Sequence, residues 1–315
     1  MKRCIVIGGN GFIGNAVVAL LSQTDREVIV LGRSSGIEHS LPASCRYVCG
    51  DYGNHAILQD LLLPGCEVID LAYSTVPKTS YRDPVFDLIS NLPPSVGLLQ
   101  EALHAKVSKL VVVSSGGTVY GPAHSLPIDE SHPTEPISPY GITKLTIDRY
   151  AVMFHRTMDL PVVVARPANA YGETQRSGSG QGFLAAAIDA ILAGREVEVF
   201  GGQGTIRDYI HVGDVAHGII AALEHGKSGE VYNIGTGKGS SHSEVIELLR
   251  EIVRPDGLEL NCKVLPERRF DVPSNVLDSR KLHLASGWSH SIELQEGLRR
   301  MWNSFLNRRR ATLKS

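Results

Sequence analysis

Short runs of hydrophobic residues recur through the first half of the chain and are separated by longer amphipathic stretches. Runs of this length predict buried strands of a parallel sheet, and the amphipathic stretches between most of them predict helices. The expected strands span residues 3–7, 27–31, 46–48, 68–71, 110–114 and 162–166. This alternation predicts an α/β fold, with a doubly wound parallel sheet that is covered on both faces.

The pattern becomes less regular after about residue 168. Glycine-rich segments at 177–182 and 201–204 separate shorter elements, and residues 207–212 and 231–233 are expected to return to the main sheet. Helices over 243–253 and 294–306 are expected in a smaller lobe, the first of them opened by a capping box of Ser241 and Glu244. We therefore predict a first domain of residues 1–167 with returns near 205–234, and a second lobe of residues 168–204 and 235–315.

A glycine-rich turn directly follows the first hydrophobic run. It consists of Gly8-Gly9-Asn10-Gly11-Phe12-Ile13-Gly14, and a helical pattern continues from it. Strand, glycine turn and helix together form the dinucleotide-binding fingerprint. Glycines are needed because the backbone must turn tightly and let a pyrophosphate approach the helix N-terminus. A glycine turn that binds nothing is the alternative, and the flanking strand and helix argue against it.

A tyrosine and a lysine four residues apart, Tyr140 and Lys144, provide the second chemical signal. In a helix this spacing places both side chains on one face. Tyrosine is a poor base because its pKa is near 10. A neighbouring ammonium favours the phenolate and lowers that pKa, so that the hydroxyl can exchange a proton with a substrate alcohol. The polar segment SSGGTVYG, residues 114–121, precedes the pair.

Further motifs follow in order along nearly the whole chain: Gly50-Asp51, Asp70-Leu-Ala72, RPANAYG at 166–172, RDYIHV at 207–212 and YNIG at 232–235. In these motifs the sequence resembles the extended short-chain dehydrogenases/reductases of the NAD-dependent epimerase/dehydratase family, and most of all their UDP-glucose 4-epimerases. The resemblance implies a Rossmann domain with a smaller C-terminal α/β lobe for the substrate. It also implies inversion of a UDP-hexose or UDP-N-acetylhexosamine at C4, through a transient 4-keto sugar and a bound nicotinamide cofactor.

The resemblance assigns roles to individual positions of this chain. Tyr140 and Lys144 become the catalytic pair. The cofactor is expected to contact Gly8, Gly11, Phe12, Ile13, Gly14, Arg33, Ser34, Asp51, Tyr52, Leu71, Ala72, Tyr73, Asn91, Ser114, Tyr140, Lys144 and Pro167. Asn91 could hold backbone near the active site or simply belong to a helix N-terminus.

Cofactor choice depends on the end of the second strand, where the chain reads Gly32-Arg33-Ser34. An NAD enzyme usually carries an acidic residue here, which binds the ribose hydroxyls. Arg33 beside two serines could bind a 2′-phosphate instead, or it could stack on adenine or point to solvent. The local residues slightly favour NADP, whereas most 4-epimerases of the family hold NAD.

One departure from the family pattern concerns catalysis. The family places a serine or threonine, which bonds the reacting sugar hydroxyl, where this chain has Gly116. Ser114, Ser115 or Thr118 is expected to replace it. The family's 4,6-dehydratases carry an aspartate and a glutamate at the positions of Gly117 and Thr118, and its decarboxylases carry a glutamate at the latter. Without these carboxylates both activities lack an acid/base pair and are disfavoured.

The nucleotide sugar is expected to contact a second set of residues. By resemblance Arg207 and Arg268 clamp the diphosphate, as suits guanidinium groups. The expected substrate contacts are Thr118, Asn169, Arg207, Arg268, Asp271 and Asn275. Asn275 falls where some epimerases have a tyrosine that closes the sugar pocket, so a smaller side chain there would leave room for an N-acetyl group.

Two other functions remain open at this point. A reductase of 4-keto-6-deoxy nucleotide sugars would consume dissociable NADPH, which Arg33 favours. A non-catalytic nucleotide sensor on the same scaffold is supported only by Gly116, whereas Tyr140 and Lys144 argue against it.

Composition excludes few classes of partner. The 31 basic and 33 acidic residues give no electrostatic reason to expect nucleic acid or a membrane surface, and no apolar run approaches membrane-spanning length. The five cysteines form no Cys-x-x-Cys pair and fit a reduced, cytoplasmic setting. No metal-binding motif is present.

By resemblance we expect a homodimer through a four-helix bundle, built from helices near 92–106 and 139–158 of each subunit.

Overall fold

The computed structural model describes residues 1–35, 41–175, 182–201, 205–266 and 272–312. Its centre is a seven-stranded sheet in which all neighbouring strands are parallel, in the order β11-β6-β5-β4-β1-β2-β3. The strands are β1 (Lys2–Ile7), β2 (Arg26–Gly32), β3 (Arg46–Cys49), β4 (Glu67–Asp70), β5 (Lys109–Val113), β6 (Val162–Pro167) and β11 (Val231–Ile234). The six predicted strands are confirmed to within two residues at each end.

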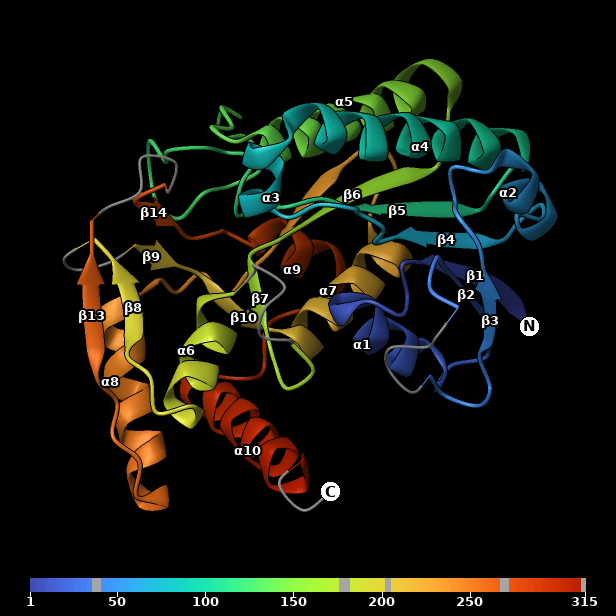
Figure 1. The fold of residues 1–315 in the computed structure, drawn as a ribbon. Helices are drawn as coiled ribbons and strands as arrows, with labels where there is room; N and C mark the ends of the chain where they lie inside the picture. The colour runs from blue at the N-terminus through green and yellow to red at the C-terminus, as the bar shows by residue number, and fades with distance from the viewer. Residues whose placement is uncertain (36–40, 176–181, 202–204, 267–271, 313–315) are drawn as a thin grey trace.

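Helices cover both faces of this sheet (Figure 1). One face packs against α2 (His55–Leu61), α3 (Pro77–Arg82), α4 (Pro84–His104) and α5 (Pro139–Met158), and the other against α1 (Phe12–Leu21), α7 (Val212–His225) and α9 (Arg280–Ser286). Because side chains alternate along a strand, Ile5 and Ile7 enter one core while Cys4 and Val6 enter the other. The predicted doubly wound α/β fold is therefore confirmed.

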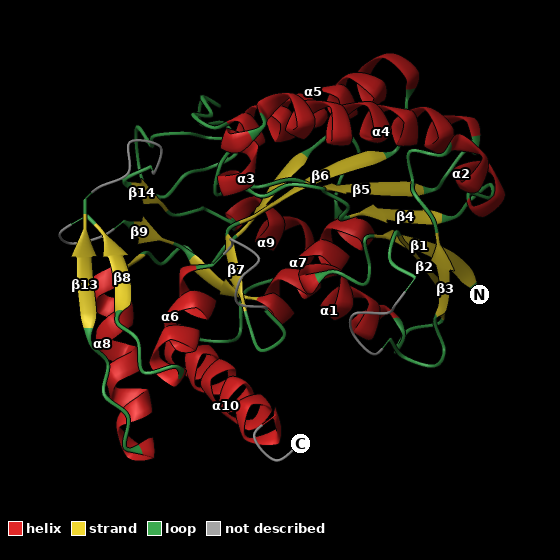
Figure 2. Ribbon diagram, viewed as in Figure 1, coloured by secondary structure: helices red, strands yellow, loops and turns green. Residues whose placement is uncertain are grey.

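The C-terminal part of the chain builds a smaller lobe at the carboxyl side of the sheet (Figure 2). Its own core is formed mainly by α6 (Phe183–Leu192), α8 (His242–Val253) and α10 (Leu294–Thr312), together with the parallel pair β8 (Val197–Phe200) and β13 (Cys262–Leu265). A short 3-10 helix, η1 (Arg254–Asp256), follows α8. The predicted capping box is present, because Ser241 accepts from the Glu244 amide and Glu244 accepts from the Ser241 amide.

Short strands connect the two parts of the molecule. They are β7 (Asn169–Tyr171), β9 (Ile206–Arg207), β10 (Tyr209–His211), β12 (Ser240–Ser241) and β14 (Ser274–Asn275). β10 pairs with β7, and β9 pairs with β12 and β14. The expected return of residues 207–212 to the main sheet is therefore wrong, whereas the return at 231–233 is confirmed as β11. The edge of β6 that faces away from β5 is taken by β11, so no position beside β6 is left for β10.

No helix within the described residues is both long and apolar enough to cross a bilayer.

Candidate active site

The predicted site residues gather where the strands of the main sheet end. The carboxyl ends of β1, β4, β5 and β6 lead into Gly8, Leu71, Ser114 and Ala168 respectively. Backbone hydrogen bonds hold these exits together, from Leu71 N to Ile7 O at 2.9 Å and from Ser114 N to Ala165 O at 2.7 Å. In doubly wound folds this edge of the sheet is where ligands bind.

The glycine turn after β1 has little room for side chains. Gly8 adopts φ 75°, in the left-handed region that favours glycine, and its amide donates to Leu31 O at 2.8 Å. A Cβ atom on Gly14 would collide with Gly8 O and lie 2.7 Å from Gly9 Cα. Gly11 caps α1 without any side-chain bond, so backbone amides at this helix end point outward. The turn thus has the bare backbone that pyrophosphate binding requires.

Tyr140 and Lys144 both lie in the first part of α5, as their spacing predicts. Pro139 occupies the first helical position, and the Ser138 hydroxyl caps the helix by accepting from Gly141 N at 3.0 Å. Tyr140 is 9% exposed and Lys144 is 6% exposed. Lys144 Nζ donates to Val113 O at 2.9 Å, so the ammonium is held at the end of β5.

Tyr73, which follows β4, lies against both members of this pair. Its ring packs edge to face on the Tyr140 ring, with centroids 4.8 Å apart. Lys144 Nζ lies 4.2 Å from the centroid of the same Tyr73 ring, within the range of a cation–π contact. The two predicted catalytic side chains therefore meet through Tyr73.

The pKa of Tyr140 differs in direction from the sequence-based expectation. Burial raises it above the usual value and the charge of Asp87 adds to this effect, while the Ser115 hydroxyl lowers it. Lys144 was expected to lower the Tyr140 pKa, but its ammonium is directed to Val113 O and to the Tyr73 ring.

Burial also lowers the pKa of Lys144 itself. Three carboxylates counteract this effect and favour the ammonium form, those of Asp70, Asp148 and Asp87. Burial raises the pKa of Asp70 to about 6, although Lys144 and the Ala72 amide lower it. Buried acidic groups thus surround the lysine.

The three candidate hydroxyls occupy different places. Ser115 faces Tyr140 closely enough to affect its pKa. Ser114 is buried at the end of β5, beside the Asp148 carboxylate. Thr118 Oγ1 is buried and has no hydrogen-bond partner among the described residues.

Gly116 is closely surrounded, which explains why no side chain stands there. A Cβ atom on Gly116 would collide with Leu277 Cδ1 and lie 3.0 Å from the carbonyl oxygen of Arg166. Its own carbonyl oxygen accepts from Asn275 Nδ2 at 3.0 Å. A serine at this position would not fit this arrangement.

The other end of the predicted cofactor site lies beside β2. The side chains of Asn10 and Tyr47 lie close against Gly32. A Cβ atom added to Gly32 would be 2.7 Å from Asn10 Oδ1 and 2.8 Å from the Tyr47 hydroxyl. The Tyr47 hydroxyl donates to Ser34 O at 2.6 Å. Arg33 is exposed, and Asp51, also exposed, accepts from Gly53 N at 2.8 Å.

The predicted substrate residues come together only in part. Asn169 on β7 lies beside Gly117, whose Cβ would be 2.9 Å from Asn169 Oδ1. Arg207 on β9 and Asn275 on β14 are register partners. Asn275 is 1% exposed, and its Oδ1 has no partner among the described residues. Arg268 and Asp271 lie outside the described residues.

A family model described as the NAD dependent epimerase/dehydratase family matches residues 4–235. The chain belongs to this family.

Known members of the epimerase/dehydratase family align over almost their whole length. The UDP-glucose 4-epimerase of Mycolicibacterium smegmatis is 32% identical, over 97% of this chain and 99% of its own. The structure of a Thermotoga maritima UDP-glucose 4-epimerase with UDP-glucose superposes with a TM-score of 0.90 at 32% identity, covering 99% of this chain and 100% of that one. A Thermus thermophilus UDP-glucose 4-epimerase in complex with NAD gives a TM-score of 0.88 at 30% identity, covering 97% and 99%.

Two features of the site were not predicted from the sequence. The helix expected near 92–106 begins earlier, at Pro84, and this first part contains the buried Asp87. Thr143 in α5 donates to Asp87 Oδ2 at 2.7 Å. The available signal was Asp83-Pro84, a helix cap followed by proline at the first helical position. The role of Asn91, by contrast, is one of the two alternatives that the sequence left open: it lies inside α4, not at its start, and accepts from Ser74 N at 2.7 Å beside Tyr73.

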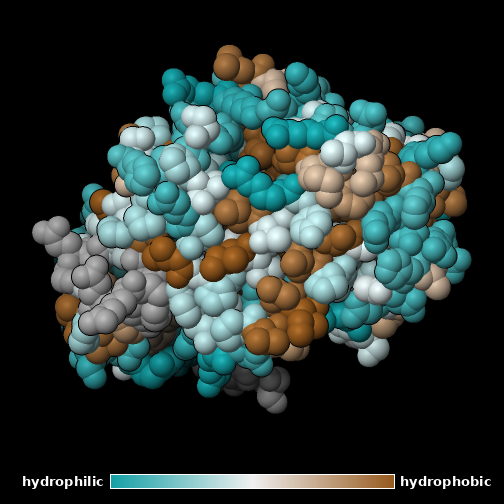
Figure 3. Space-filling view, turned by 90° about the horizontal axis from the view of Figure 1, so that it is seen from above, coloured by the Kyte–Doolittle hydropathy of each residue, from teal (hydrophilic) through white to brown (hydrophobic). Residues whose placement is uncertain are grey.

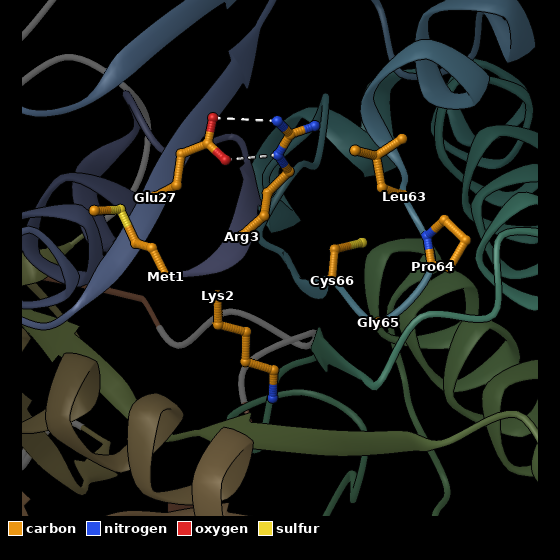
Figure 4. A pocket seen from close by; sticks show the side chains of 8 residues that line it. All are labelled: Met1, Lys2, Arg3, Glu27, Leu63, Pro64, Gly65 and Cys66. Carbon is orange, nitrogen blue, oxygen red and sulfur yellow. Dashed lines mark hydrogen bonds and ion pairs between the residues drawn. The ribbon is translucent and has the colours of Figure 1, made fainter.

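A separate pocket of about 560 Å³ opens at the opposite, amino-terminal edge of the sheet (Figure 4). It is lined by Met1, Lys2, Arg3, Glu27, Leu63, Pro64, Gly65 and Cys66. Its charged side chains are already paired, because Arg3 pairs with Glu27 at 2.9 Å and Lys2 pairs with Glu67 at 2.7 Å. None of the family motifs reaches this edge, so the candidate site is at the carboxyl edge.

Proposed function

We propose that the protein is a nucleotide-sugar 4-epimerase that acts on a UDP-hexose or a UDP-N-acetylhexosamine. The observation that carries this proposal is the burial of Tyr140 and Lys144 together at the carboxyl edge of the sheet, beside a glycine turn of bare backbone. The names of two similar proteins, both UDP-glucose 4-epimerases, support it. Dehydration and decarboxylation are disfavoured because Gly117 and Thr118 offer no carboxylates.

A nicotinamide cofactor fits the residues at this edge. Gly8, Gly11 and Gly14 would bring backbone amides to its pyrophosphate, and Tyr73, whose loop Asn91 holds at Ser74 N, would border its nicotinamide end. A bound nicotinamide supplies a reversible hydride acceptor for C4 of the sugar. The neighbouring complex with NAD supports this assignment.

We assign the proton transfer to Tyr140. Its phenolate oxygen would accept the proton of the sugar 4-hydroxyl as the hydride leaves C4, and would return that proton when C4 is reduced on the other face. Lys144, kept cationic by the surrounding carboxylates, would act on Tyr140 through the Tyr73 ring, which contacts both side chains. Ser115 is the best replacement for the hydroxyl missing at Gly116, because it faces Tyr140, and Thr118 would contact the sugar.

The substrate would extend from Tyr140 toward the smaller lobe. We propose that Arg207 and Arg268 bind the diphosphate, with Asn169 and Asp271 as further contacts. Asn275 offers a buried amide oxygen rather than a bulky ring at the sugar pocket, which supports acceptance of N-acetylated sugars.

The choice between NAD and NADP turns on the end of β2. Neither Gly32 nor its neighbours Asn10 and Tyr47 would repel a 2′-phosphate, and Arg33 is exposed beside them. These residues favour NADP slightly, whereas the neighbouring complex contains NAD. We infer that the cofactor is retained during turnover, because an epimerase has no net redox change.

We further propose a homodimer through α4 and α5. These helices pack side by side along one face of the molecule. Their exposed apolar side chains are Val85, Phe86, Leu88 and Ile89 on α4 and Ile142, Tyr150 and Met158 on α5. Figure 3 looks onto this side of the molecule, where hydrophobic side chains gather in an interrupted band between hydrophilic ones. Packing against a second copy would remove this apolar surface from water.

The deciding experiment uses the purified full-length protein without added cofactor. UDP-glucose and UDP-N-acetylglucosamine are supplied separately, the C4 epimers are quantified, and the nucleotide released by acid is identified by mass spectrometry. Epimer formation with retained dinucleotide, lost by at least about 100-fold in Tyr140→Phe, supports the proposal. A second assay supplies a 4-keto-6-deoxy nucleotide sugar together with NADPH. Net consumption of NADPH there, with no epimer formed from either UDP-sugar, would show a reductase instead.

A further inference from the structure

We propose that Asp87 is a positioning residue for the Tyr140–Lys144 pair, acting through Tyr73 and Thr143. The inference rests on the proposed function, because it concerns the residues to which catalysis is assigned above. Asp87 itself lies in α4 and would not touch the sugar.

The Asp87 carboxylate is fully buried, and both of its oxygens accept hydrogen bonds. Its exposure is 0%, and it forms no salt bridge with a described residue. Oδ1 accepts from the Thr75 hydroxyl and, at 3.4 Å, from the Tyr73 hydroxyl. Oδ2 accepts from Thr143 Oγ1 at 2.7 Å. Burying a carboxylate costs free energy unless such bonds satisfy it, so a position that served packing alone would favour an apolar side chain.

The groups that Asp87 holds are those that contact the catalytic pair. Tyr73 lies against the Tyr140 ring at 4.8 Å between centroids and under Lys144 Nζ at 4.2 Å. Thr143 stands immediately before Lys144 in α5 and three residues after Tyr140. One carboxylate therefore fixes the pair from two sides, through the loop after β4 and through α5.

A second bond from the same helix strengthens this connection. Asn91 Nδ2 donates to Asp87 O at 2.7 Å, while Asn91 Oδ1 accepts from Ser74 N at 2.7 Å. The loop of Tyr73 to Thr75 is thus tied to α4 by its backbone at Ser74 and by its hydroxyls on either side. Loss of the Asp87 carboxylate would release the Tyr73 hydroxyl from α4 and leave the Thr75 hydroxyl with only the 3.4 Å bond from Asn91 Nδ2.

The charge of Asp87 also affects the protonation of the pair. The titratable and charged groups that face Tyr140 and Lys144 are Asp70 from β4, Tyr73 from the following loop, Asp87 from α4, and Asp148 from α5 with its partner Arg166 from β6. Asp87 opposes the phenolate of Tyr140 and favours the ammonium of Lys144. Removing its charge while keeping its shape should lower both pKa values and move the pH profile of activity to lower pH.

The test compares Asp87→Asn and Asp87→Ala in the full-length holoenzyme, with Asp214→Asn as a matched control. Asp214 is equally buried, 2% exposed, and caps the backbone at Ser291 and Ile292 on the opposite side of the sheet. We expect Asp87→Ala to lower kcat by about 10- to 100-fold with little change in KM, because the pair is misplaced. Asp87→Asn should restore most of kcat and shift the kcat–pH profile down by about 1 pH unit.

The outcomes separate this inference from the proposed function. If both Asp87 variants match Asp214→Asn in kcat and in pH profile, Asp87 is not a positioning residue. If the wild-type protein epimerises no UDP-sugar, the proposed function fails. Crystal structures of wild type and Asp87→Ala then test whether Asp87 positions the pair. Displacement of the Tyr73 and Tyr140 rings from their 4.8 Å separation would then support positioning, and unchanged rings would overturn it. If Asp87→Ala does not fold, the pH profile of Asp87→Asn alone gives the answer.

Discussion

Leu277 Cδ1 occupies the space into which a side chain at Gly116 would project. This contact joins the strand exit beside the catalytic pair to the segment after β14. A serine or threonine here, where the family has its sugar-binding hydroxyl, would require the Leu277 side chain to move.

We therefore predict that Gly116→Ser lowers both stability and activity, although it restores a hydroxyl that relatives use. Overpacking of a filled site should cost about 1–3 kcal/mol in the free energy of unfolding. Urea denaturation measures this cost, and repeating it in a Leu277→Ala background provides the control, since there the same substitution should cost less. A Gly116→Ser variant that is as stable as wild type and more active would contradict this prediction. It would show that the Leu277 side chain moves aside at little cost in free energy.

The buried ion pair of Asp148 and Arg166 gives a second prediction. Their side chains are 2% and 4% exposed and the charged atoms are 2.9 Å apart. Asp148→Asn should cost about 3–5 kcal/mol, because it leaves the Arg166 charge uncompensated inside the protein. Glu293→Gln, which breaks the exposed pair with Lys238, should cost about 1 kcal/mol or less. Urea denaturation measures both costs. An equal loss in the free energy of unfolding for the two variants would show that burial of the ion pair does not determine its contribution.

Local patterns were sufficient to predict the main sheet. The strands of the first half are short hydrophobic runs, and the glycine turn and the pair of Tyr140 and Lys144 each lie on the element that their spacing predicts. Residues 207–212 were misassigned because their hydrophobic character is that of a strand, but pairing partners are decided by tertiary structure. The edge of β6 was already taken by β11.

The site was predictable as a list of positions but not as a set of contacts. Lys144 was expected to act on Tyr140 directly, and its ammonium instead binds Val113 O and the Tyr73 ring. Asp87 was missed because the apolar residues around it, such as Phe86 and Ile89, are exposed while the acid is buried. Hydrophobic patterning assumes that apolar side chains are buried and acids exposed. Because the first turns of α4 show the opposite, the pattern predicted neither the start of this helix nor the buried carboxylate of Asp87.

The raised pKa of Asp70, about 6, predicts a pH-dependent effect on stability. Because the native protein binds this proton more tightly than the unfolded chain, the favourable contribution is complete below about pH 4 and is lost as the pH rises through about 6. Asp70→Asn removes the buried charge, so it should stabilise the protein by about 1–3 kcal/mol at pH 8 and have no effect near pH 4.

Thermal or urea unfolding at a series of pH values measures this difference. Asp60→Asn, on the exposed side of α2, is the control for the loss of a carboxylate at the surface. Destabilisation by Asp70→Asn at pH 8 would mean that attraction to Lys144 outweighs the cost of burial.

The exposed apolar side chains of α4 predict the state of association. Ile89 is 60% exposed and Phe86 is 54% exposed, and both would be covered in the proposed dimer. Ile89→Glu would place an unpaired charge in that interface on each subunit, so the dissociation constant should rise at least about 100-fold. Light scattering after gel filtration would then give the chain mass of 34.1 kDa instead of twice that value. Leu284→Glu is the matched control, since Leu284 is 84% exposed on α9, far from this surface, and its substitution should leave the dimer intact. A dimer that persists in Ile89→Glu would place the interface elsewhere, and a wild-type monomer would leave the apolar face without the partner proposed for it.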